Sequence, residues 1–418
     1  MEKSSIKQII LEQKDLFNKK LKIVERAIPD NILKSPKIVV ITGVRRCGKS
    51  TLLRQLSATL KGGNYFNFED ERLIDFTYND FNNLLEAFLE LNPSDKVFFF
   101  DEIQEIYGWE KFVRRIFEDG YKVFVTGSNA RLLSSEISTS LTGRNLRLEL
   151  LPFSFKEYLL MHDFVLKQNY TTKEKAFISN FVREYLAYGG FPEVILTKDK
   201  EELNLIYQDI IIKDLLVRFK IRDTKAFREL ALYLLSNCSK KMSLNNLKTL
   251  LSFSTTTKVK NYVDFLSEAY LFFLVPKYDV SIKKQIINDK KVYVIDTGLI
   301  NTVAFQFTEN RGRILENAVF LELKRNKKEI FYFADTSECD FLIRSNNRIT
   351  AAIQVSVSLA NPKTQKRELD GLLAAMNKFG LKHGLIITET EEKLWTIAGK
   401  KIRIIPLWKF LLSLEREI

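Results

Sequence analysis

The feature that most constrains the fold of this chain is a glycine-rich segment, residues 43–51, which reads Gly-Val-Arg-Arg-Cys-Gly-Lys-Ser-Thr. It follows a run of β-forming residues, 37–42, and precedes a helical pattern, 52–56. This is the pattern G-x-x-x-x-G-K-[ST] between a strand and a helix, in which main-chain N–H groups and the helix N-terminus surround phosphate oxygens. The segment therefore predicts a phosphate-binding loop within an α/β fold.

All nine residues of this loop are candidate nucleotide-binding residues: Gly43, Val44, Arg45, Arg46, Cys47, Gly48, Lys49, Ser50 and Thr51. In such loops the lysine, here Lys49, reaches the β- and γ-phosphates, and the hydroxyl of the next residue, here Ser50, ligates Mg²⁺. We therefore expect ATP and Mg²⁺ as cofactors, with Lys49 also acting in catalysis.

An acidic pair supplies the second half of the predicted site. Residues 97–100 are wholly apolar, as expected of a central parallel strand buried on both faces, and Asp101 and Glu102 follow directly. Open α/β sheets bind ligands at the C-terminal ends of their strands. We predict that Asp101 holds Mg²⁺, through water, and that Glu102 is the general base that polarises the attacking water.

Two further polar residues are catalytic candidates. Ser128 follows a third apolar strand, residues 122–126, where its hydroxyl could contact the γ-phosphate or the water, although a turn former is also expected there. Arg144 precedes an alternating run, residues 146–150, and is a candidate arginine finger that stabilises charge on the transferred phosphoryl group. A surface arginine at a helix end explains Arg144 equally well, and the sequence leaves open whether it would act in cis or in trans.

Six segments follow one another along the chain: GVRRCGKST, FFFDEIQEIYGWEKFVRRI, VTGSNARLLSSEISTSLTGR, LPFSFKEYL, YLAYGGFPEV and IYQDIIIKDLLVR. Their order resembles that of bacterial and archaeal AAA-type ATPases that carry a C-terminal domain of unknown function. The resemblance covers almost the whole chain. It implies a P-loop core, a helical segment, a winged helix and a nuclease-like C-terminal fold, and it gives no chemistry for the motif Gly189–Val194.

The predicted fold class is α/β, with an AAA-type P-loop parallel sheet followed by a helical lid, a winged helix and a restriction-endonuclease-like domain. The predicted parts are an N-terminal helical segment (1–35), the ATPase core (36–150), the lid (151–222), the winged helix (223–290) and the nuclease-like domain (291–418).

The charge of the chain suggests a polyanionic partner. The net charge is +13, and residues 213–260 hold eleven Lys or Arg against three Asp or Glu. Lys258 and Lys260 fall near the start of the third predicted helix of the winged helix, and an apparent hairpin follows with Lys283, Lys284, Lys290 and Lys291 as wing charges. We predict DNA binding by Lys258, Lys260, Lys283 and Lys284, while winged helices also mediate protein contacts.

The last predicted domain carries a degenerate nuclease pattern. Glu316 on a helix and Asp340 on a strand match the first two positions of an active site that gathers Mg²⁺, and Glu338 lies nearby. The third strand has Gln354 and Ser356 where active members have a Glu-x-Lys pair. Gln cannot supply the charge and Ser cannot replace the cation, so these two residues count against nuclease activity and favour a residual role in binding DNA or protein.

Composition bounds the remaining expectations. Three distant cysteines argue against a disulfide framework, and two histidines against a structural zinc site. No apolar run is long enough for a membrane span, so we expect a cytoplasmic protein. If Arg144 acts in trans, the active sites lie at subunit interfaces, so we also expect a homo-oligomer. Three functions remain open: an ATPase that acts on DNA, a nucleotide-dependent protein-binding switch, and an ATP-gated nuclease.

Overall fold

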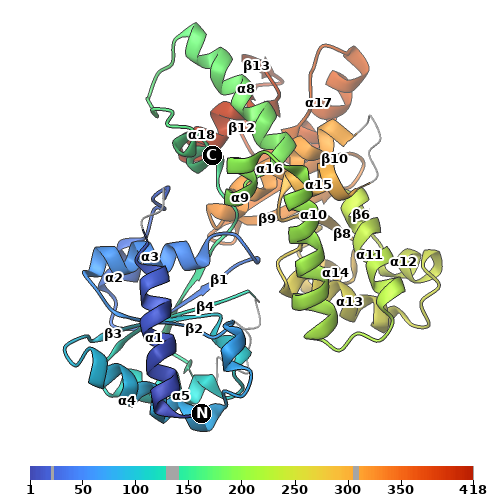
Figure 1. Cartoon of the computed structure of the whole chain (residues 1–418). Coiled ribbons are helices and arrows are strands. Elements are labelled where there is room, and N and C mark those ends of the chain that lie inside the picture. Colours follow the sequence, from blue (N-terminus) through green and yellow to red (C-terminus); the bar gives the residue numbers. More distant parts are fainter. Residues whose placement is uncertain (20–22, 129–140, 305–309, 418) are drawn as a thin grey trace. The chain divides into compact units, whose positions relative to one another are not determined.

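The computed structural model describes residues 1–19, 23–128, 141–304 and 310–417 (Figure 1). Two compact units make up the chain, Met1–Leu151 and Pro152–Ile418. Among the described residues, the first unit contains one sheet and the second contains two, and each unit has its own apolar core.

A parallel sheet of five strands, in the order β2-β3-β4-β1-β5, forms the centre of the first unit. The strands are β1 (Ile38–Thr42), β2 (Asn64–Asn67), β3 (Val97–Asp101), β4 (Lys122–Gly127) and β5 (Asn145–Glu149). The predicted parallel sheet is confirmed. Strand β4 lies between β1 and β3, and all three strands are parallel. Their C-terminal ends therefore lie side by side at one end of the sheet, where the phosphate-binding loop and the acidic pair were predicted.

Helices cover both faces of this sheet. They are α1 (Lys3–Phe17), α2 (Asp30–Lys34), α3 (Lys49–Leu60), α4 (Phe81–Leu91) and α5 (Trp109–Glu118), with short 3₁₀ turns η1 (Glu71–Leu73), η2 (Tyr78–Asp80) and η3 (Ile103–Glu105). Figure 1 shows the strands between α3 on one side and α4 and α5 on the other. The amphipathic helix α1 buries Ile6, Ile9 and Ile10 in the same core as α4, so this N-terminal segment is part of the first unit.

The aromatic residues of the acidic strand explain why it is central. Phe98 and Phe100 point to one face, into the core shared with α4 and α5. Phe99 points to the opposite face, where its ring stacks on that of Phe124 with centroids 5.1 Å apart. A strand that buries both faces in this way has no solvent side, which is why its sequence is continuously apolar.

The second unit begins with helices, as predicted for residues 151–222. They are α7 (Phe155–Met161), α8 (Thr172–Tyr188), α9 (Pro192–Thr197) and α10 (Lys200–Asp209), the last continuing as a π-helical turn, η5 (Ile210–Val217). Ser154 and Thr171 cap α7 and α8 with capping boxes completed by Glu157 and Glu174.

Residues 224–294 form a module of helices and a three-stranded antiparallel sheet with strand order β6-β8-β7. Its elements are α11 (Thr224–Ser236), β6 (Lys241–Met242), α12 (Leu244–Leu250), α13 (Thr256–Glu268), β7 (Phe272–Pro276), α14 (Ile282–Ile287) and β8 (Lys290–Val294). Two details differ from the prediction. The connection between β7 and β8 contains α14 instead of a simple hairpin, and the expected boundary at 290/291 falls inside β8, which pairs with β6 and β7.

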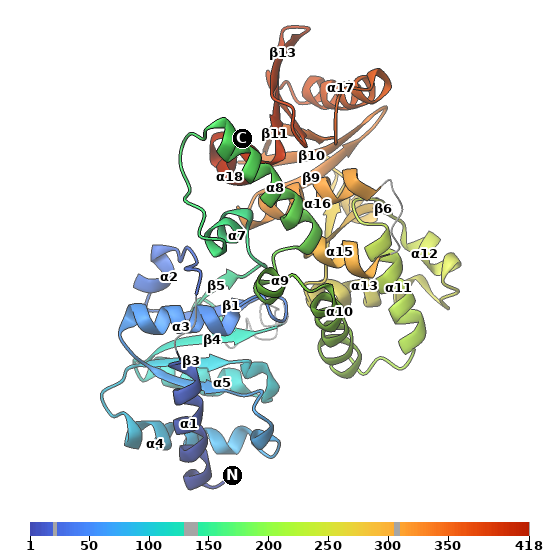
Figure 2. The same cartoon turned by 45° about the horizontal axis from the view of Figure 1, so that its top comes forward.

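A six-stranded mixed sheet, in the order β13-β14-β12-β11-β10-β9, forms the C-terminal part of the second unit. Its elements are α15 (Thr297–Val303), α16 (Asn310–Arg325), β9 (Glu329–Ala334), β10 (Glu338–Ser345), β11 (Arg348–Val355), α17 (Pro362–Lys378), β12 (His383–Thr388), β13 (Lys393–Ile397), β14 (Lys400–Pro406) and α18 (Leu407–Glu417). Helix α17 packs on β10, β11 and β12 (Figure 2).

Candidate nucleotide site

The loop between β1 and α3 has the backbone that the glycine pattern predicts. Gly48 adopts φ 99° directly before α3 and Arg46 adopts φ 62°, both in the left-handed region. Gly43 is required by close packing, because a Cβ there would lie 2.1 Å from the carbonyl oxygen of Leu150. The loop therefore turns sharply and presents the N-terminus of α3 at the edge of the sheet.

Lys49 connects this loop to the acidic strand. Its ammonium lies 3.1 Å from Glu102 Oε1 and donates to the carbonyl oxygens of Gly43 (3.2 Å) and Val44 (3.4 Å). Burial has the largest single effect and lowers the pKa of Lys49, but the charge and the hydrogen bond of Glu102, together with other nearby groups such as Asp101, outweigh burial and raise this pKa above its ordinary value. The lysine is therefore a charged group held by one carboxylate and two carbonyls.

Asp101 ends β3 among hydroxyl groups. The Thr126 hydroxyl donates to Asp101 Oδ1, the Tyr65 hydroxyl donates to Oδ2 over 2.9 Å, and the Ser50 hydroxyl also bonds this carboxylate. Burial, followed by the negative charge of Glu102, raises the pKa of Asp101. The structure thus brings Ser50 and Asp101, the two predicted Mg²⁺ ligands, into direct contact.

Glu102 occupies a strained position next to this pair. Its φ is 49°, which is uncommon for a residue with a side chain, and its main-chain N–H donates to Thr126 Oγ1 over 2.9 Å. Gln104 Nε2 donates to Glu102 Oε2 over 2.6 Å. Burial raises the pKa of Glu102, but Lys49, together with the hydrogen bond from Gln104, outweighs it and leaves the pKa below its ordinary value. The carboxylate is therefore ionised at neutral pH.

The other predicted loop residues divide by environment. Val44 and Cys47 are buried, and burial raises the pKa of the Cys47 thiol, which is therefore protonated at neutral pH. Arg45 Nη1 lies 2.6 Å from Glu69. Thr51 is partly exposed in the first turn of α3.

Arg144 lies at the N-terminal end of β5, whereas the loop lies at the C-terminal end of the neighbouring strand β1. Its carbonyl oxygen accepts from the N–H of Ile38, the first residue of β1, whereas the loop follows the last residue of that strand. Its guanidinium is 3.5 Å from Glu118, at the end of α5. Ser128 is buried directly after β4, at the same edge as the loop. The intervening residues 129–140, including part of one motif, lie outside the described residues.

Sequence reasoning missed four residues that shape the site: Arg26, Tyr65, Gln104 and Thr126. A signal existed for Thr126, the one polar residue in an otherwise apolar run at residues 123–126. Arg26 has no motif around it, yet Nη2 donates to the carbonyl of Cys47 (2.8 Å) and Nη1 to that of Leu151 (2.9 Å). It thereby ties the loop to the last residue of the first unit.

The motif Gly189–Val194 has a packing role that the sequence did not reveal. The N–H of Gly190 donates to Asp296 Oδ2 over 2.6 Å, and the N–H of Gly298 donates to Oδ1 over 2.8 Å. A Cβ on Gly189, which has φ 80°, would lie 1.8 Å from the Asp296 carboxylate. Burial raises the pKa of Asp296 to about 7.

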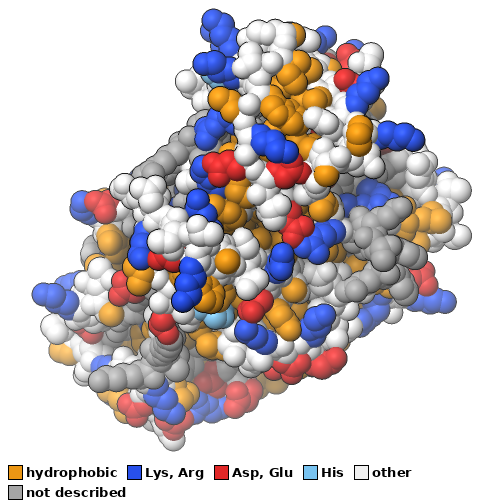
Figure 3. All heavy atoms as spheres, turned by 90° about the horizontal axis from the view of Figure 1, so that it is seen from above, with side chains coloured by type: hydrophobic (Ala, Val, Ile, Leu, Met, Phe, Trp, Pro, Cys, Tyr) orange, Lys and Arg blue, Asp and Glu red, His pale blue; other side chains and the backbone are white. Residues whose placement is uncertain are grey.

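The four lysines predicted to bind DNA differ in their surroundings. Lys260, Lys283 and Lys284 are exposed, the last two on α14. Lys258 lies 2.7 Å from Asp223. On the face that Figure 3 shows, basic side chains are scattered among acidic and apolar ones.

The interpretation of Lys291 as a wing charge is wrong. This side chain is buried and contacts Glu316 on α16 and Glu338 and Asp340 on β10. Of the four predicted residues of the degenerate site, Asp340 and Gln354 are in direct contact: Asp340 N–H donates to Gln354 Oε1 over 3.1 Å. The Ser356 hydroxyl instead donates to the carbonyl of Ser358 over 3.2 Å.

Within the described ranges, no helix is both long and apolar enough to cross a membrane. The family model of the AAA domain matches residues 35–159, and two domains of unknown function match residues 180–310 and 311–410.

Two relatives show how far the similarity extends. An uncharacterized protein of Methanocaldococcus jannaschii is 38% identical over 432 residues, covering 97% of this chain and 96% of the relative. An uncharacterized protein of Haemophilus influenzae is 31% identical over 358 residues, covering 80% and 86%.

Two solved structures of DNA-bound proteins overlap only loosely with this chain. DnaA bound to AMPPCP and single-stranded DNA covers 57% of this chain and 84% of its own, with 15% identity and a TM-score of 0.26. The Aeropyrum pernix ORC1 protein in complex with DNA covers 67% and 93%, with 12% identity and a TM-score of 0.31. These scores are too low to carry an argument about function.

Proposed function

We propose that this chain, which belongs to the AAA-type P-loop ATPases that carry C-terminal domains of unknown function, binds ATP with Mg²⁺, hydrolyses it, and couples the cycle to DNA. The observation that carries the proposal is the contact of Lys49 with Glu102, 3.1 Å apart, beneath a loop that ends at the N-terminus of α3. The Lys49 ammonium, the Glu102 carboxylate and the main-chain N–H groups at the start of α3 thus lie together at the C-terminal end of the strands.

The donor set at this edge fits Mg²⁺. A hydroxyl oxygen from Ser50 and a carboxylate from Asp101 are hard oxygen ligands, and their contact leaves them placed to hold one ion together with phosphate oxygens and water. Bound Mg²⁺ neutralises charge that develops on the β- and γ-phosphates during transfer. Tyr65 and Thr126 orient Asp101 for this role through their hydroxyl groups.

Lys49 and Glu102 have complementary tasks in this proposal. When triphosphate enters the loop, Lys49 exchanges the Glu102 carboxylate for phosphate oxygens. Glu102 loses its cation and becomes free to take a proton from the attacking water. Gln104 and the Thr126 hydroxyl keep Glu102 in its unusual backbone position, and Ser128 is the proposed contact to the γ-phosphate or the water.

Coupling to DNA is supported by charge. Residues 213–260 carry eleven basic and three acidic residues, and Lys260, Lys283 and Lys284 are exposed. A lysine ammonium lacks the bidentate fork of arginine, so lysines contact the phosphate backbone more than they read base edges. We therefore propose DNA binding without strong sequence preference. A nucleotide-dependent protein-binding switch is the second candidate, favoured by the exposed apolar residues beside these lysines, Val280, Ile282, Ile286 and Ile287.

Arg144 leads us to propose a homo-oligomer. Arg144 lies at the N-terminal end of the strands, away from the loop at their C-terminal end. An arginine finger at this residue would therefore serve a neighbouring subunit. We expect a mixture of Arg144→Ala and Lys49→Ala proteins to regain ATPase activity, because one variant supplies the finger and the other the intact loop. Full turnover by a demonstrated monomer would contradict this arrangement.

The experiment that tests the function is ATP hydrolysis with and without single-stranded, duplex and branched DNA. We expect hydrolysis that requires Lys49 and rises with DNA. Neutralising Lys258, Lys260, Lys283 and Lys284 together should weaken DNA binding for all sequences and flatten the plot of log K against log salt by roughly 0.9 per lost duplex contact.

A matched control for this experiment neutralises four exposed lysines outside the basic stretch: Lys173, Lys200, Lys382 and Lys401. The control changes the net charge equally, so it should leave the salt dependence close to that of the wild type. If both quadruple variants behave alike, Lys258, Lys260, Lys283 and Lys284 do not form the DNA surface, and the protein-binding switch becomes the better account.

A further inference from the structure

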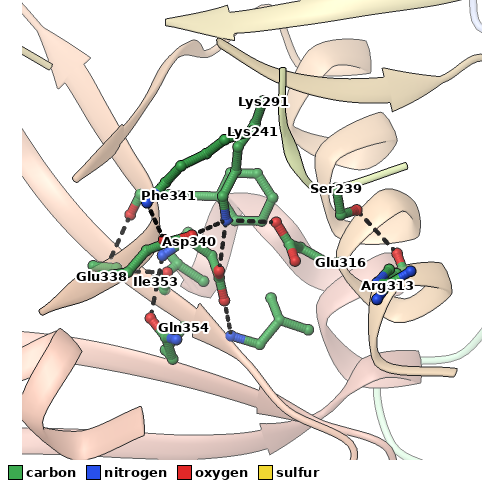
Figure 4. A network of polar contacts seen from close by, with 12 residues as sticks. Ser239, Lys241, Lys291, Arg313, Glu316, Glu338, Asp340, Phe341, Ile353 and Gln354 are labelled. Carbon is green, nitrogen blue, oxygen red and sulfur yellow. Dashed lines mark hydrogen bonds and ion pairs between the residues drawn. The ribbon is translucent and has the colours of Figure 1, made fainter. Parts of the chain in front are cut away.

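A buried ionic network surrounds Lys291 on β8 (Figure 4). The lysine side chain is 2% exposed, and its Nζ lies 2.9 Å from Glu316 Oε1, 2.8 Å from Glu338 Oε1 and 2.9 Å from Asp340 Oδ1. Glu316 comes from α16, and the other two carboxylates come from β10. One ammonium from the three-stranded sheet therefore joins three carboxylates of the C-terminal domain.

Other donors hold these carboxylates in place. The Tyr293 hydroxyl donates to Glu316 Oε1 over 2.7 Å, and the main-chain N–H of Val355 donates to Asp340 Oδ2 over 3.0 Å. Lys241 on β6 lies 2.7 Å from Glu338 Oε2. Each carboxylate thus has a second partner besides Lys291.

The layout that resembles a nuclease implies a divalent cation at this place, and the residues do not fit one. The Lys291 ammonium stands among the acidic side chains that would be ligands. The amide oxygen of Gln354 accepts from Asp340 N–H, and its amide nitrogen donates to Glu368. Across the described part of the chain, no three His, Cys, Asp or Glu side chains are arranged to hold a metal ion.

We propose that the Lys291 ammonium takes the place of the divalent cation, so that this centre is a metal-independent ionic joint that fastens the 224–294 module to the C-terminal sheet. Hydrogen bonds between side chains and main-chain groups connect the same two parts. The Asn317 side chain donates to the carbonyl of Val294 (2.9 Å) and accepts from its N–H (2.8 Å). The Ser239 hydroxyl donates to the carbonyl of Arg313 over 3.1 Å.

Solvent reaches the joint, which makes the proposal testable in solution. A cavity of 840 Å³ is lined by Glu316, Glu338, Asp340 and Gln354 among others. A metal ion added to the protein can therefore approach the carboxylates, and its failure to bind would reflect the ammonium and not a closed path.

The first test measures bound Mn²⁺ by electron paramagnetic resonance in the nucleotide-free, full-length protein. We expect Glu316→Gln and Asp340→Asn to bind as many Mn²⁺ ions per chain as the wild type, while Ser50→Ala reports any ion at the phosphate-binding loop. A Mn²⁺ site in the wild type that Glu316→Gln or Asp340→Asn abolishes and Ser50→Ala keeps would overturn the proposal.

The second test removes the ammonium. Lys291→Ala should gain one Mn²⁺ per chain, lose it again when Asp340→Asn is added, and melt at a higher temperature with Mn²⁺ than without it. Lys241→Ala, which removes a lysine that contacts only Glu338 in this cluster, should gain no site. Folded Lys291→Ala protein that binds no additional Mn²⁺ would overturn the proposal, and if this variant does not fold, the first test decides.

Discussion

Two buried lysines of this molecule hold carboxylates at nearly the same distance, yet their surroundings assign them different roles. Lys49 lies 3.1 Å from Glu102 in the first unit, and Lys291 lies 2.8–2.9 Å from three carboxylates in the second. Lys49 sits in a glycine loop at a helix N-terminus, a place that attracts phosphate. Lys291 sits on a strand among three carboxylates.

This difference shows that the role of a buried ion pair depends on whether a ligand can replace one of its two partners. A phosphate can compete with one carboxylate for Lys49, so that contact is exchangeable. Three carboxylates, each held by a second partner, surround Lys291, so we expect that contact to persist. The first arrangement suits a catalytic cycle and the second suits a joint between elements.

The largest predicted effect concerns the exchangeable pair. Glu102→Gln should keep nucleotide binding and lose turnover by about 10²–10⁴-fold, because the amide keeps the shape and loses the base. Steady-state hydrolysis and equilibrium binding of a fluorescent ATP analogue measure the two properties separately. Normal turnover by the purified variant would remove Glu102 from the catalytic role.

The second prediction concerns the persistent contact of Lys291. Lys291→Met should lower the free energy of unfolding by about 3–5 kcal/mol, because it leaves buried carboxylates without their cation. Adding Glu316→Gln and Asp340→Asn should restore much of the loss, since the uncompensated charges are removed together. Urea denaturation of the single and triple variants measures both values, and a triple variant less stable than Lys291→Met would contradict the account.

A third prediction uses a buried carboxylate that pairs with no lysine. Asp296 is held mainly by main-chain N–H groups and has a pKa of about 7, so the folded state keeps a proton that the unfolded state releases near pH 4. Its contribution to stability is therefore greatest at low pH and declines as pH rises to about 7.

The unfolding free energy of the wild type relative to Asp296→Asn should thus fall between about pH 4 and pH 7, by at most about 1.4 kcal/mol per unit, and stay level above. Thermal midpoints of the two proteins, compared at several pH values, provide the measurement. A difference that does not change with pH would mean that Asp296 is ionised in the folded state.

The smallest predicted effect concerns Gln104. Its hydrogen bond helps to lower the pKa of Glu102, so Gln104→Ala should raise that pKa and move the acid limb of the kcat/KM profile to higher pH by up to about one unit. Gln8→Ala, which removes a glutamine bonded to Glu12 on the exposed face of α1, is a matched control that should leave the profile unchanged. A shift to lower pH in Gln104→Ala would contradict the assigned direction.

Local patterns were enough to group the residues of the candidate nucleotide site, because these residues are close in sequence or follow strand ends. Lys49 and Ser50 belong to one motif, and Asp101 and Glu102 follow one apolar strand, so strand order alone brings them together. Arg26 was not predictable, since its contacts to Cys47 and Leu151 join distant segments without a pattern.

The ionic joint at Lys291 could not be predicted from the sequence for the same reason. Lys290 and Lys291 are adjacent cations that fit an exposed wing, and only the docking of β8 against α16 and β10 buries the second of them. Likewise, the Gly189–Val194 motif gained a reason only when Asp296, about a hundred residues later, was found against Gly189 and Gly190.

The most direct test of the contrast between the two lysines is a crystal structure of the wild-type protein with Mg²⁺ and a non-hydrolysable ATP analogue. We predict Lys49 Nζ on phosphate oxygens and out of contact with Glu102, while Lys291 Nζ keeps its contacts with Glu316, Glu338 and Asp340. A Lys49 that still pairs with Glu102 above bound nucleotide, or a Mg²⁺ ion between Glu316 and Asp340 with Lys291 displaced, would contradict the account.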